Sequence, residues 1–207
     1  MSERTIGRRA ALAGLAATGA AAALPWRAAR AQAEGVALGL FSVGDPEAPV
    51  SMVEYVSLTC PHCATFHDEV YPRIKTDYID TGKVRLELRE VYFDRFGLWA
   101  GMLARCGGES RYFGFISLLL ERQDEWAGAE NVAEIFARYG KQAGLSEERV
   151  VACLSDGEGQ KALVEQFQDY RDDPALTGTP TILVAGEKVE DWSFENVAAA
   201  IEAELGS

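Results

Sequence analysis

The sequence VSMVEYVSLTCPHC, residues 50–63, ends a strand-like run with a closely spaced pair of cysteines, Cys60 and Cys63. A helix-like run begins near Ala64, so the pair lies where a strand gives way to a helix. We therefore expect the first thiol to lie beside unpaired backbone N–H groups and the positive end of the helix dipole, both of which lower its pKa. A stabilised thiolate favours the reduced form, and this makes the disulfide form a strong oxidant.

The two residues between the cysteines fit the same chemistry. Pro61 removes one N–H group and holds the first turn in helical φ, whereas His62 can offer a positive or hydrogen-bonding partner to the Cys60 thiolate. The motif predicts a redox-active dithiol. Two alternatives stay open: half of a zinc or copper site completed by further ligands such as His67, and a purely structural disulfide.

The amino-terminal sequence has the pattern of an export signal. Arg8 and Arg9 precede an apolar run over residues 10–24, and Ala31-Gln32-Ala33 matches a cleavage site. We expect residues 1–33 to be a signal peptide cleaved near Ala33, which places the mature protein in the periplasm. The arginine pair favours the twin-arginine route, while the weak continuation of that motif leaves the general route open.

Charge and length limit the classes of protein that fit. The chain of 207 residues has 20 basic and 32 acidic residues, and removal of five Arg and one Glu with the signal leaves a net charge of −16. This acidity argues against binding to nucleic acid and to anionic membrane surfaces. The mature length allows one domain with an inserted subdomain, and four cysteines in an exported chain allow at most two disulfides.

The pattern of apolar residues predicts alternating strands and helices. Strands are expected at residues 36–43, 50–57 and 84–91, and a helix at residues 62–80 with a break near Tyr71 caused by Pro72. Glycine-separated helices follow at residues 95–106, 110–123, 129–140, 146–154 and 156–171, with Ser146 and Ser155 as candidate starts. Two strands at 181–185 and 188–190 and a helix from 194 to 205, capped by Ser193, end the chain.

The helical stretch is rich in aromatic residues, which we interpret mainly as its core, with one or two as the rim of a peptide-binding groove: Phe96, Trp99, Tyr112, Phe113, Phe115, Trp126 and Phe136.

Glu54 stands out because it lies in the middle of a strand that is otherwise apolar on both faces. A buried carboxylate must be paired, hydrogen-bonded or protonated. Glu54 is interpreted either as a residue that reaches the sheet edge or as a proton acceptor and redox tuner below the dithiol. Arg89, in the next strand, is a candidate partner.

The Cys-Pro-His-Cys motif after a strand, the Thr179-Pro180 pair before a later strand and the helical block between them resemble the DsbA-like branch of the thioredoxin fold. The resemblance covers residues 36–205. It implies an α/β fold in which residues 34–94 and 174–207 form a thioredoxin-like domain and residues 95–173 an inserted helical subdomain.

The resemblance also implies roles for individual residues. Cys60 is the exposed nucleophile, Cys63 the more buried partner and His62 the main tuner of Cys60. Glu54 resembles a buried acidic position of the family. Pro180, preceded by Thr179, matches a cis-proline that faces the disulfide and helps to bind substrate peptide.

The implied function is a protein disulfide oxidoreductase that needs no cofactor and introduces disulfides into reduced or unfolded exported proteins. A quinone-linked membrane protein is the expected reoxidant, and the short stretch before the first strand favours a monomer. Thr179 is commoner in isomerase and reductase relatives than in oxidases, so an isomerase or reductase stays open as the alternative.

Cys106 and Cys153 both lie near the ends of predicted helices. Because thiols seldom stay free in an oxidising compartment, we expect them to form a second, structural disulfide within the helical subdomain. The alternative is a pair of buried free cysteines that act as small hydrophobic residues.

Overall fold

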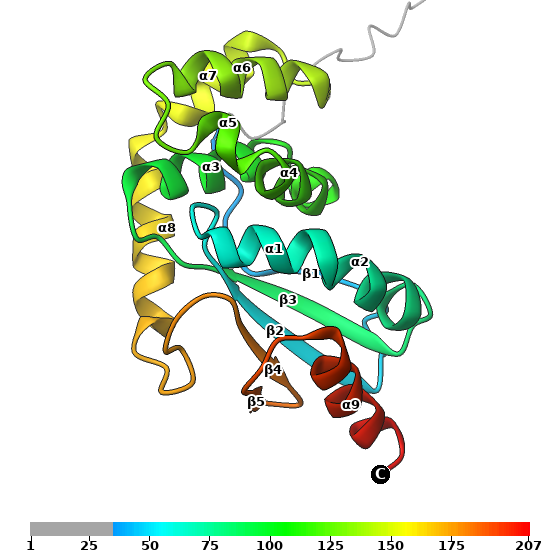
Figure 1. Ribbon diagram of the computed structural model, residues 1–207. Coiled ribbons are helices and arrows are strands. Elements are labelled where there is room, and N and C mark those ends of the chain that lie inside the picture. Colours follow the sequence, from blue (N-terminus) through cyan, green and yellow to red (C-terminus); the bar gives the residue numbers. More distant parts are fainter. Residues whose placement is uncertain (1–34) are drawn as a thin grey trace, which may run out of the picture. The chain divides into compact units, whose positions relative to one another are not determined.

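A mixed sheet of five strands runs through residues 35–207, the part of the chain that the computed structural model describes (Figure 1). The strand order is β1-β3-β2-β4-β5, and only the central pair β2–β3 is parallel. The strands are β1 (Phe41–Val43), β2 (Val50–Val56), β3 (Val84–Glu90), β4 (Thr181–Val184) and β5 (Glu187–Val189). The expected signal peptide, residues 1–33, lies outside the described residues.

Strand β2 is buried on both faces because helices cover the sheet on both sides. Alternate side chains of a strand point to opposite faces. Met52 and Val56 belong to the main core, whereas Tyr55 packs in a smaller cluster with Leu183 and Tyr170. The continuous apolar sequence of β2 follows from this double burial.

One face of the sheet is covered by the helices that follow β2 and by the last helix of the chain (Figure 1). They are α1 (Pro61–Glu69), α2 (Tyr71–Ile74), the π-helix η1 (Lys75–Ile79) and α9 (Phe194–Leu205). The expected break falls at Val70, which is followed by α2 with Pro72 in its first turn. A proline is tolerated there because the N–H that it lacks would have no intrahelical partner.

The stretch between β3 and β4 is helical. It contains α3 (Arg95–Cys106), α4 (Glu109–Glu121), α5 (Gln123–Trp126), α6 (Val132–Gln142), α7 (Glu147–Leu154) and α8 (Gly157–Arg171). Four of the seven aromatic residues assigned to its core are buried, and the other three are partly buried against it. Ser146 caps α7 by accepting a hydrogen bond from the Arg149 N–H at 3.2 Å.

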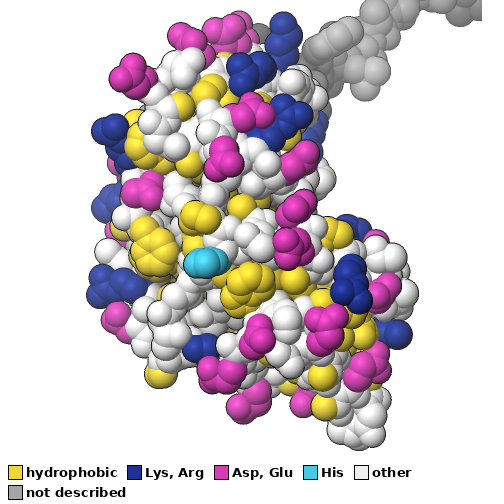
Figure 2. All heavy atoms as spheres, in the orientation of Figure 1, with side chains coloured by type: hydrophobic (Ala, Val, Ile, Leu, Met, Phe, Trp, Pro, Cys, Tyr) yellow, Lys and Arg dark blue, Asp and Glu magenta, His cyan; other side chains and the backbone are white. Residues whose placement is uncertain are grey.

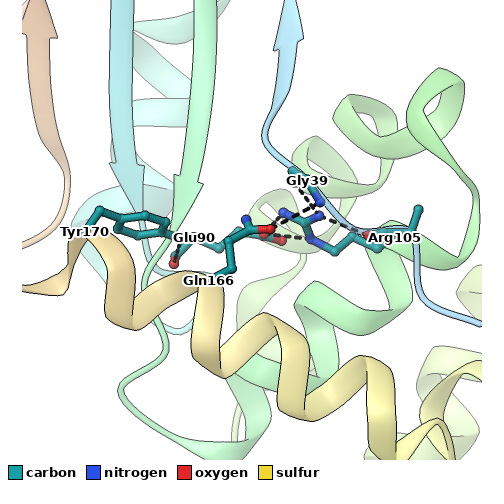
Figure 3. Close-up of polar contacts among 6 residues, drawn as sticks. Gly39, Glu90, Arg105, Gln166 and Tyr170 are labelled. Carbon is teal, nitrogen blue, oxygen red and sulfur yellow. Dashed lines mark hydrogen bonds and ion pairs between the residues drawn. The ribbon is translucent and has the colours of Figure 1, made fainter.

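A buried ion pair joins this helical stretch to the sheet. Arg105 of α3 and Glu90 at the end of β3 are 0% and 1% exposed, and the guanidinium donates two hydrogen bonds to one Glu90 oxygen (Figure 3). The Arg105 Nη1 also donates to the carbonyl oxygens of Ala37 and Gly39, at 3.0 and 2.9 Å. Tyr170 of α8 donates to the Glu90 carbonyl oxygen at 2.7 Å. The pair therefore connects β3, α3, α8 and the segment before β1.

Residues 36–40 of that segment were expected to begin the first strand, but the strand covers only Phe41–Val43. Side chains of the helical stretch form hydrogen bonds with its backbone N–H and C=O groups instead. The Val36 N–H donates to Asp156 at 2.9 Å, the Gly39 N–H to Gln166 at 3.1 Å, and Arg149 donates to the Gly35 carbonyl at 3.0 Å. These hydrogen bonds with side chains of α3, α7 and α8 replace a ladder with β3 over this segment.

Helices α3 and α7 are linked by a disulfide between Cys106 and Cys153, whose Cα atoms are 5.9 Å apart. Both cysteines are buried.

One expected helix start differs from the structure. Ser155 does not begin α8; Asp156 caps it by accepting from the Gly159 N–H at 2.9 Å, and its carboxylate also accepts from the Val36 N–H. Ser193 occupies the cap position of α9 as expected, although its side chain makes no capping hydrogen bond. Within residues 35–207, no helix combines the length and the apolar character needed to cross a membrane.

Candidate active site

The two cysteines of the motif lie at the amino-terminal end of α1, and both are free thiols. Cys60 occupies the cap position and Pro61 begins the helix, so the sulfur of Cys60 lies beside N–H groups that have no intrahelical acceptor. Cys60 is partly exposed, whereas Cys63 is fully buried. Only the first sulfur is therefore open to attack by a second protein.

The environments of the two sulfurs move their pKa values in opposite directions. A hydrogen bond from the Cys63 thiol, aided by the Thr179 side chain and the N–H groups of Cys63 and His62, lowers the pKa of Cys60 to about 5 against the opposing effect of burial. Burial raises the pKa of Cys63 far above its usual range, and the neighbouring Cys60 and Glu54 raise it further. At neutral pH the reduced pair thus holds one thiolate and one thiol.

The loop before β4 approaches Cys60 from across the site. The Thr179–Pro180 bond is cis, and the Thr179 carbonyl oxygen lies 3.2 Å from the Cys60 sulfur. The Thr179 hydroxyl is buried and has no geometric hydrogen-bond partner among the described residues, which leaves it free to donate to the thiolate. Residues far apart in the sequence thereby meet at one sulfur.

Below the dithiol, Glu54 is fully buried in β2 and pairs with His67 of α1. The His67 Nε2 lies 2.9 and 3.2 Å from the two carboxylate oxygens. The expectation that Arg89 is the partner was wrong. Glu54 is opposite Leu88 in the parallel register, so Arg89 is aligned with Tyr55, and it binds Glu87 and the Tyr55 hydroxyl. Nor does Glu54 lie at a sheet edge, because β2 is the central strand.

The side chain of His62 is exposed, and its ring centroid lies 6.4 Å from that of Trp192. No hydrogen bond joins this imidazole to Cys60 within the described part of the chain; the contact that lowers the Cys60 pKa comes from the His62 backbone N–H. Figure 2 shows a histidine flanked by hydrophobic side chains, with acidic side chains to one side of it. The tuning of Cys60 by the imidazole stays a prediction.

Two residues that the sequence did not single out hold the active-site loop. The Gln123 side chain of α5 donates to the carbonyl oxygens of Leu58 and Cys60, at 2.7 and 3.1 Å. Asp94, at the start of α3, accepts from the Thr59 hydroxyl at 2.7 Å. Neither residue type marks a loop anchor in a sequence, although Asp94 precedes a helix as a cap does.

Among residues 35–207, no three His, Cys, Asp or Glu side chains are grouped as a metal site would need. His67, the further ligand considered for Cys60 and Cys63, directs its Nε2 at Glu54 instead.

Comparison with known proteins agrees with this geometry. A family model described as thioredoxin matches residues 39–203. A Rickettsia typhi protein, provisionally named a protein-disulfide oxidoreductase, is 33% identical over 164 residues, which are 79% of this chain and 61% of that protein. The chain thus spans about three fifths of the length of that relative.

Two further relatives match over more of their own length. Disulfide bond formation protein D of Bacillus subtilis is 25% identical over 171 residues, covering 79% of this chain and 76% of that protein. The crystal structure of α-DsbA1 from Wolbachia pipientis superposes with a TM-score of 0.74 at 28% identity, covering 83% of this chain and 94% of that one.

Proposed function

The chain belongs to the thioredoxin family, and from its site we propose that it is a protein-disulfide oxidoreductase that oxidises dithiols in other proteins. The observation that carries the proposal is the difference in exposure and pKa between the two sulfurs. Cys60 is partly exposed with a pKa lowered to about 5, whereas Cys63 is buried with a raised pKa. Stabilising the Cys60 thiolate stabilises the reduced enzyme, and the disulfide form is correspondingly oxidising.

The reaction begins with the Cys60–Cys63 disulfide. A substrate thiolate attacks the Cys60 sulfur, a mixed disulfide forms, and the electron pair of the broken bond goes to Cys63, which takes up a proton. A second thiolate of the substrate then attacks the substrate sulfur of the mixed disulfide. Cys60 leaves as a stable thiolate, the substrate gains a disulfide and the enzyme is left with two reduced cysteines.

The surroundings of Cys60 supply the substrate-binding part of the proposal. Thr179, which is joined to Pro180 by a cis bond, has its carbonyl oxygen 3.2 Å from the Cys60 sulfur, and the Trp192 ring lies near the exposed His62. Aromatic and backbone groups of this kind suit an extended, unfolded chain. Reduced or unfolded exported proteins are the substrates that we propose, with a quinone-linked membrane protein as reoxidant, a monomeric state and a periplasmic location.

A second candidate, an isomerase or reductase, rests on the identity of one residue at the site. The residue before the cis-proline is Thr179, whose carbonyl oxygen lies 3.2 Å from the Cys60 sulfur, and the family resemblance makes a threonine there commoner in isomerases and reductases than in oxidases. Glu54, whose charge acts on Cys63, is the other tuning group that we propose.

The experiment that separates these candidates is the equilibrium of the purified protein with glutathione, combined with oxidation of a reduced peptide that contains two cysteines. We expect a reduction potential of about −120 mV for the Cys60–Cys63 pair and efficient peptide oxidation. A reductase would have a reduction potential of about −270 mV. Cys60→Ser should abolish the reaction, and Cys63→Ser should trap mixed disulfides. A Cys63 sulfur that alkylates faster than Cys60 would contradict the assignment of the nucleophile.

A further inference from the structure

The connection from α8 to β4, residues 172–180, brings the Thr179 carbonyl oxygen to 3.2 Å from the Cys60 sulfur (Figure 1). Its residues are exposed or half-buried, except for Pro180, which is buried. A loop with so little apolar burial is one of the less stable parts of a fold. The position of Thr179 against the sulfur therefore depends on the hydrogen bonds that hold the connection.

Both ends of the connection are held by one residue of β2. Tyr55 is paired with Thr181 in the antiparallel register of β2 and β4, and this fixes the end of the connection. The Tyr55 hydroxyl donates to the Asp173 carboxylate at 2.5 Å, and this fixes its beginning. Tyr55 also precedes Cys60 by five residues in the sequence. The loop and the dithiol are thus both positioned from the same strand.

The direction of the Tyr55 hydroxyl is set by Arg89, its neighbour on β3. The Arg89 Nη1 donates to the Tyr55 oxygen at 2.8 Å. Because that oxygen accepts from a cation on one side, its own hydrogen is directed to the carboxylate on the other, and both hydrogen bonds are of the strong, charge-assisted kind. Burial and the bond to Asp173 raise the pKa of Tyr55, so the hydroxyl keeps the proton that it donates.

Asp173 transmits this constraint along the loop. Its second carboxylate oxygen accepts from the Ala175 N–H at 2.8 Å, and its backbone carbonyl accepts from the Leu176 N–H at 2.9 Å. Beyond this turn, the Gly178 carbonyl accepts from the Thr181 hydroxyl at 2.7 Å. Hydrogen bonds on both sides of Thr179 therefore restrict where its carbonyl oxygen can lie.

We propose that Tyr55, Asp173 and Arg89 position the Thr179–Pro180 part of the loop and thereby set how tightly a substrate chain binds beside Cys60. The inference rests on the function proposed above, in which this part of the loop contacts the substrate. The three residues act through the loop rather than on a sulfur, so they are positioning residues. A loop that leaves its place lowers the apparent affinity by the fraction of molecules in which it is displaced.

Oxidation of a reduced peptide with two cysteines tests the proposal when its rate is measured over a range of peptide concentrations. Glutathione disulfide regenerates the enzyme. Tyr55→Phe keeps the ring in the core but removes the link to Asp173, and we expect KM to rise about three- to tenfold. The kcat should stay within about twofold of wild type, since a bound peptide holds the loop in place. Alkylation of Cys60 by iodoacetamide at pH 7 should keep its rate, because the sulfur is untouched.

Tyr170→Phe is the matched control. Tyr170 packs in the same small cluster, its ring centroid 5.8 Å from that of Tyr55, and its hydroxyl donates to the Glu90 carbonyl oxygen (Figure 3). The substitution removes a tyrosine hydrogen bond from this cluster but leaves the link between Tyr55 and Asp173 intact. Its urea midpoint should fall, as a lost buried hydrogen bond requires, while KM stays at the wild-type value.

Variants of Asp173 test the same link from the other side. Asp173→Asn keeps an oxygen that can accept from the Tyr55 hydroxyl, whereas Asp173→Ala does not. We expect KM to rise in Asp173→Ala and to rise much less in Asp173→Asn. The double variant Tyr55→Phe, Asp173→Ala should have no higher KM than Asp173→Ala alone, because both changes break one interaction.

A wild-type KM in Tyr55→Phe, an equal rise in Tyr170→Phe, or independent effects in the double variant would overturn the proposal. If Tyr55→Phe did not fold, as judged by circular dichroism, Asp173→Ala and Asp173→Asn would decide the question. A wild-type protein that failed to oxidise the peptide would instead refute the proposed function. The positioning of the loop would then be decided by hydrogen exchange of residues 174–180, which should be faster in Tyr55→Phe and unchanged in Tyr170→Phe.

Discussion

Two regions of the molecule place a buried carboxylate of an inner strand beside a basic side chain on a helix and a pair of cysteines. In one, Glu54 of β2 faces His67 of α1, next to Cys60 and Cys63. In the other, Glu90 of β3 faces Arg105 of α3, next to the Cys106–Cys153 disulfide. The parts are alike, but the regions differ in what can change.

In the Glu90 region no group readily changes its protonation or its redox state. Arginine keeps its charge at any physiological pH, its donors are used on Glu90, Ala37 and Gly39, and the neighbouring cysteines are joined. In the Glu54 region the basic residue is a histidine, a side-chain type whose charge can change near neutral pH, and the two cysteines are not joined. The comparison teaches that similar buried groups can form a permanent link in one region and stay open to chemical change in another, depending on which basic residue and which pair of cysteines complete them.

The largest effect should come from breaking the permanent pair. Arg105→Met leaves Glu90 buried without a counter-charge, and we expect the free energy of unfolding to fall by about 3–5 kcal/mol. Urea denaturation would measure the loss. As a control, Lys161→Met removes an exposed pair with Glu165 and should cost no more than about 0.5 kcal/mol. Equal losses in the two variants would show that the Glu90 pair has no special place in the fold.

Removing the disulfide should cost somewhat less. The double variant Cys106→Ala, Cys153→Ala opens a link between residues 47 apart, and the chain-entropy model gives an upper value of about 4 kcal/mol for such a loop. Thermal unfolding would report the loss, and oxidation of a reduced peptide should stay near the wild-type rate. If the variant lost peptide oxidation while remaining folded, the Cys106–Cys153 disulfide would contribute to the redox activity, and its role would not be structural alone.

The smallest effect concerns the exchangeable region and its pH dependence. Because the thiolate is the nucleophile and the Cys60 pKa is about 5, the rate of alkylation by iodoacetamide should have its midpoint there and fall about tenfold per pH unit below it. The folded pKa lies below the unfolded value of about 8.5, so the thiolate stabilises the reduced protein above that pH. This stabilisation is lost as the pH falls through about 5.

Thr179→Val sharpens the same measurement. It keeps the shape of the side chain but removes the buried hydroxyl that is free to donate to the thiolate and that lowers the Cys60 pKa, so the alkylation midpoint should move upward. An unchanged midpoint would mean that Cys63 and the backbone N–H groups hold the thiolate without Thr179.

The sequence was sufficient to predict most of the fold. Strand β2, the break before Pro72 and the last helix follow from apolar periodicity and from the missing N–H of proline. The partner of Glu54 could not be found in the same way. Arg89 seemed suitable because it lies in the neighbouring strand, but a parallel register one residue away sends its side chain to the opposite face.

His67 shows which part of a contact the sequence can predict and which part it cannot. Its spacing of four residues from Cys63 places both on one face of α1, which the sequence does show. The sequence cannot show at which residue of β2 helix α1 crosses the strand. That crossing point determines that the His67 imidazole lies beside Glu54. Gln123 was missed for a similar reason, because its contact with the Leu58 and Cys60 carbonyls depends on how α5 lies against the loop.

The fastening of residues 35–39 has a consequence for the order of events when the protein is made. Their hydrogen-bond partners Asp156 and Gln166 follow 120 and 127 residues later in the chain. At about 5–20 residues per second, the ribosome needs roughly 6–25 s to reach them. The segment that is synthesised first among the described residues therefore completes its docking only after α8 exists, and a chain cut short before Asp156 would lack both of these partners.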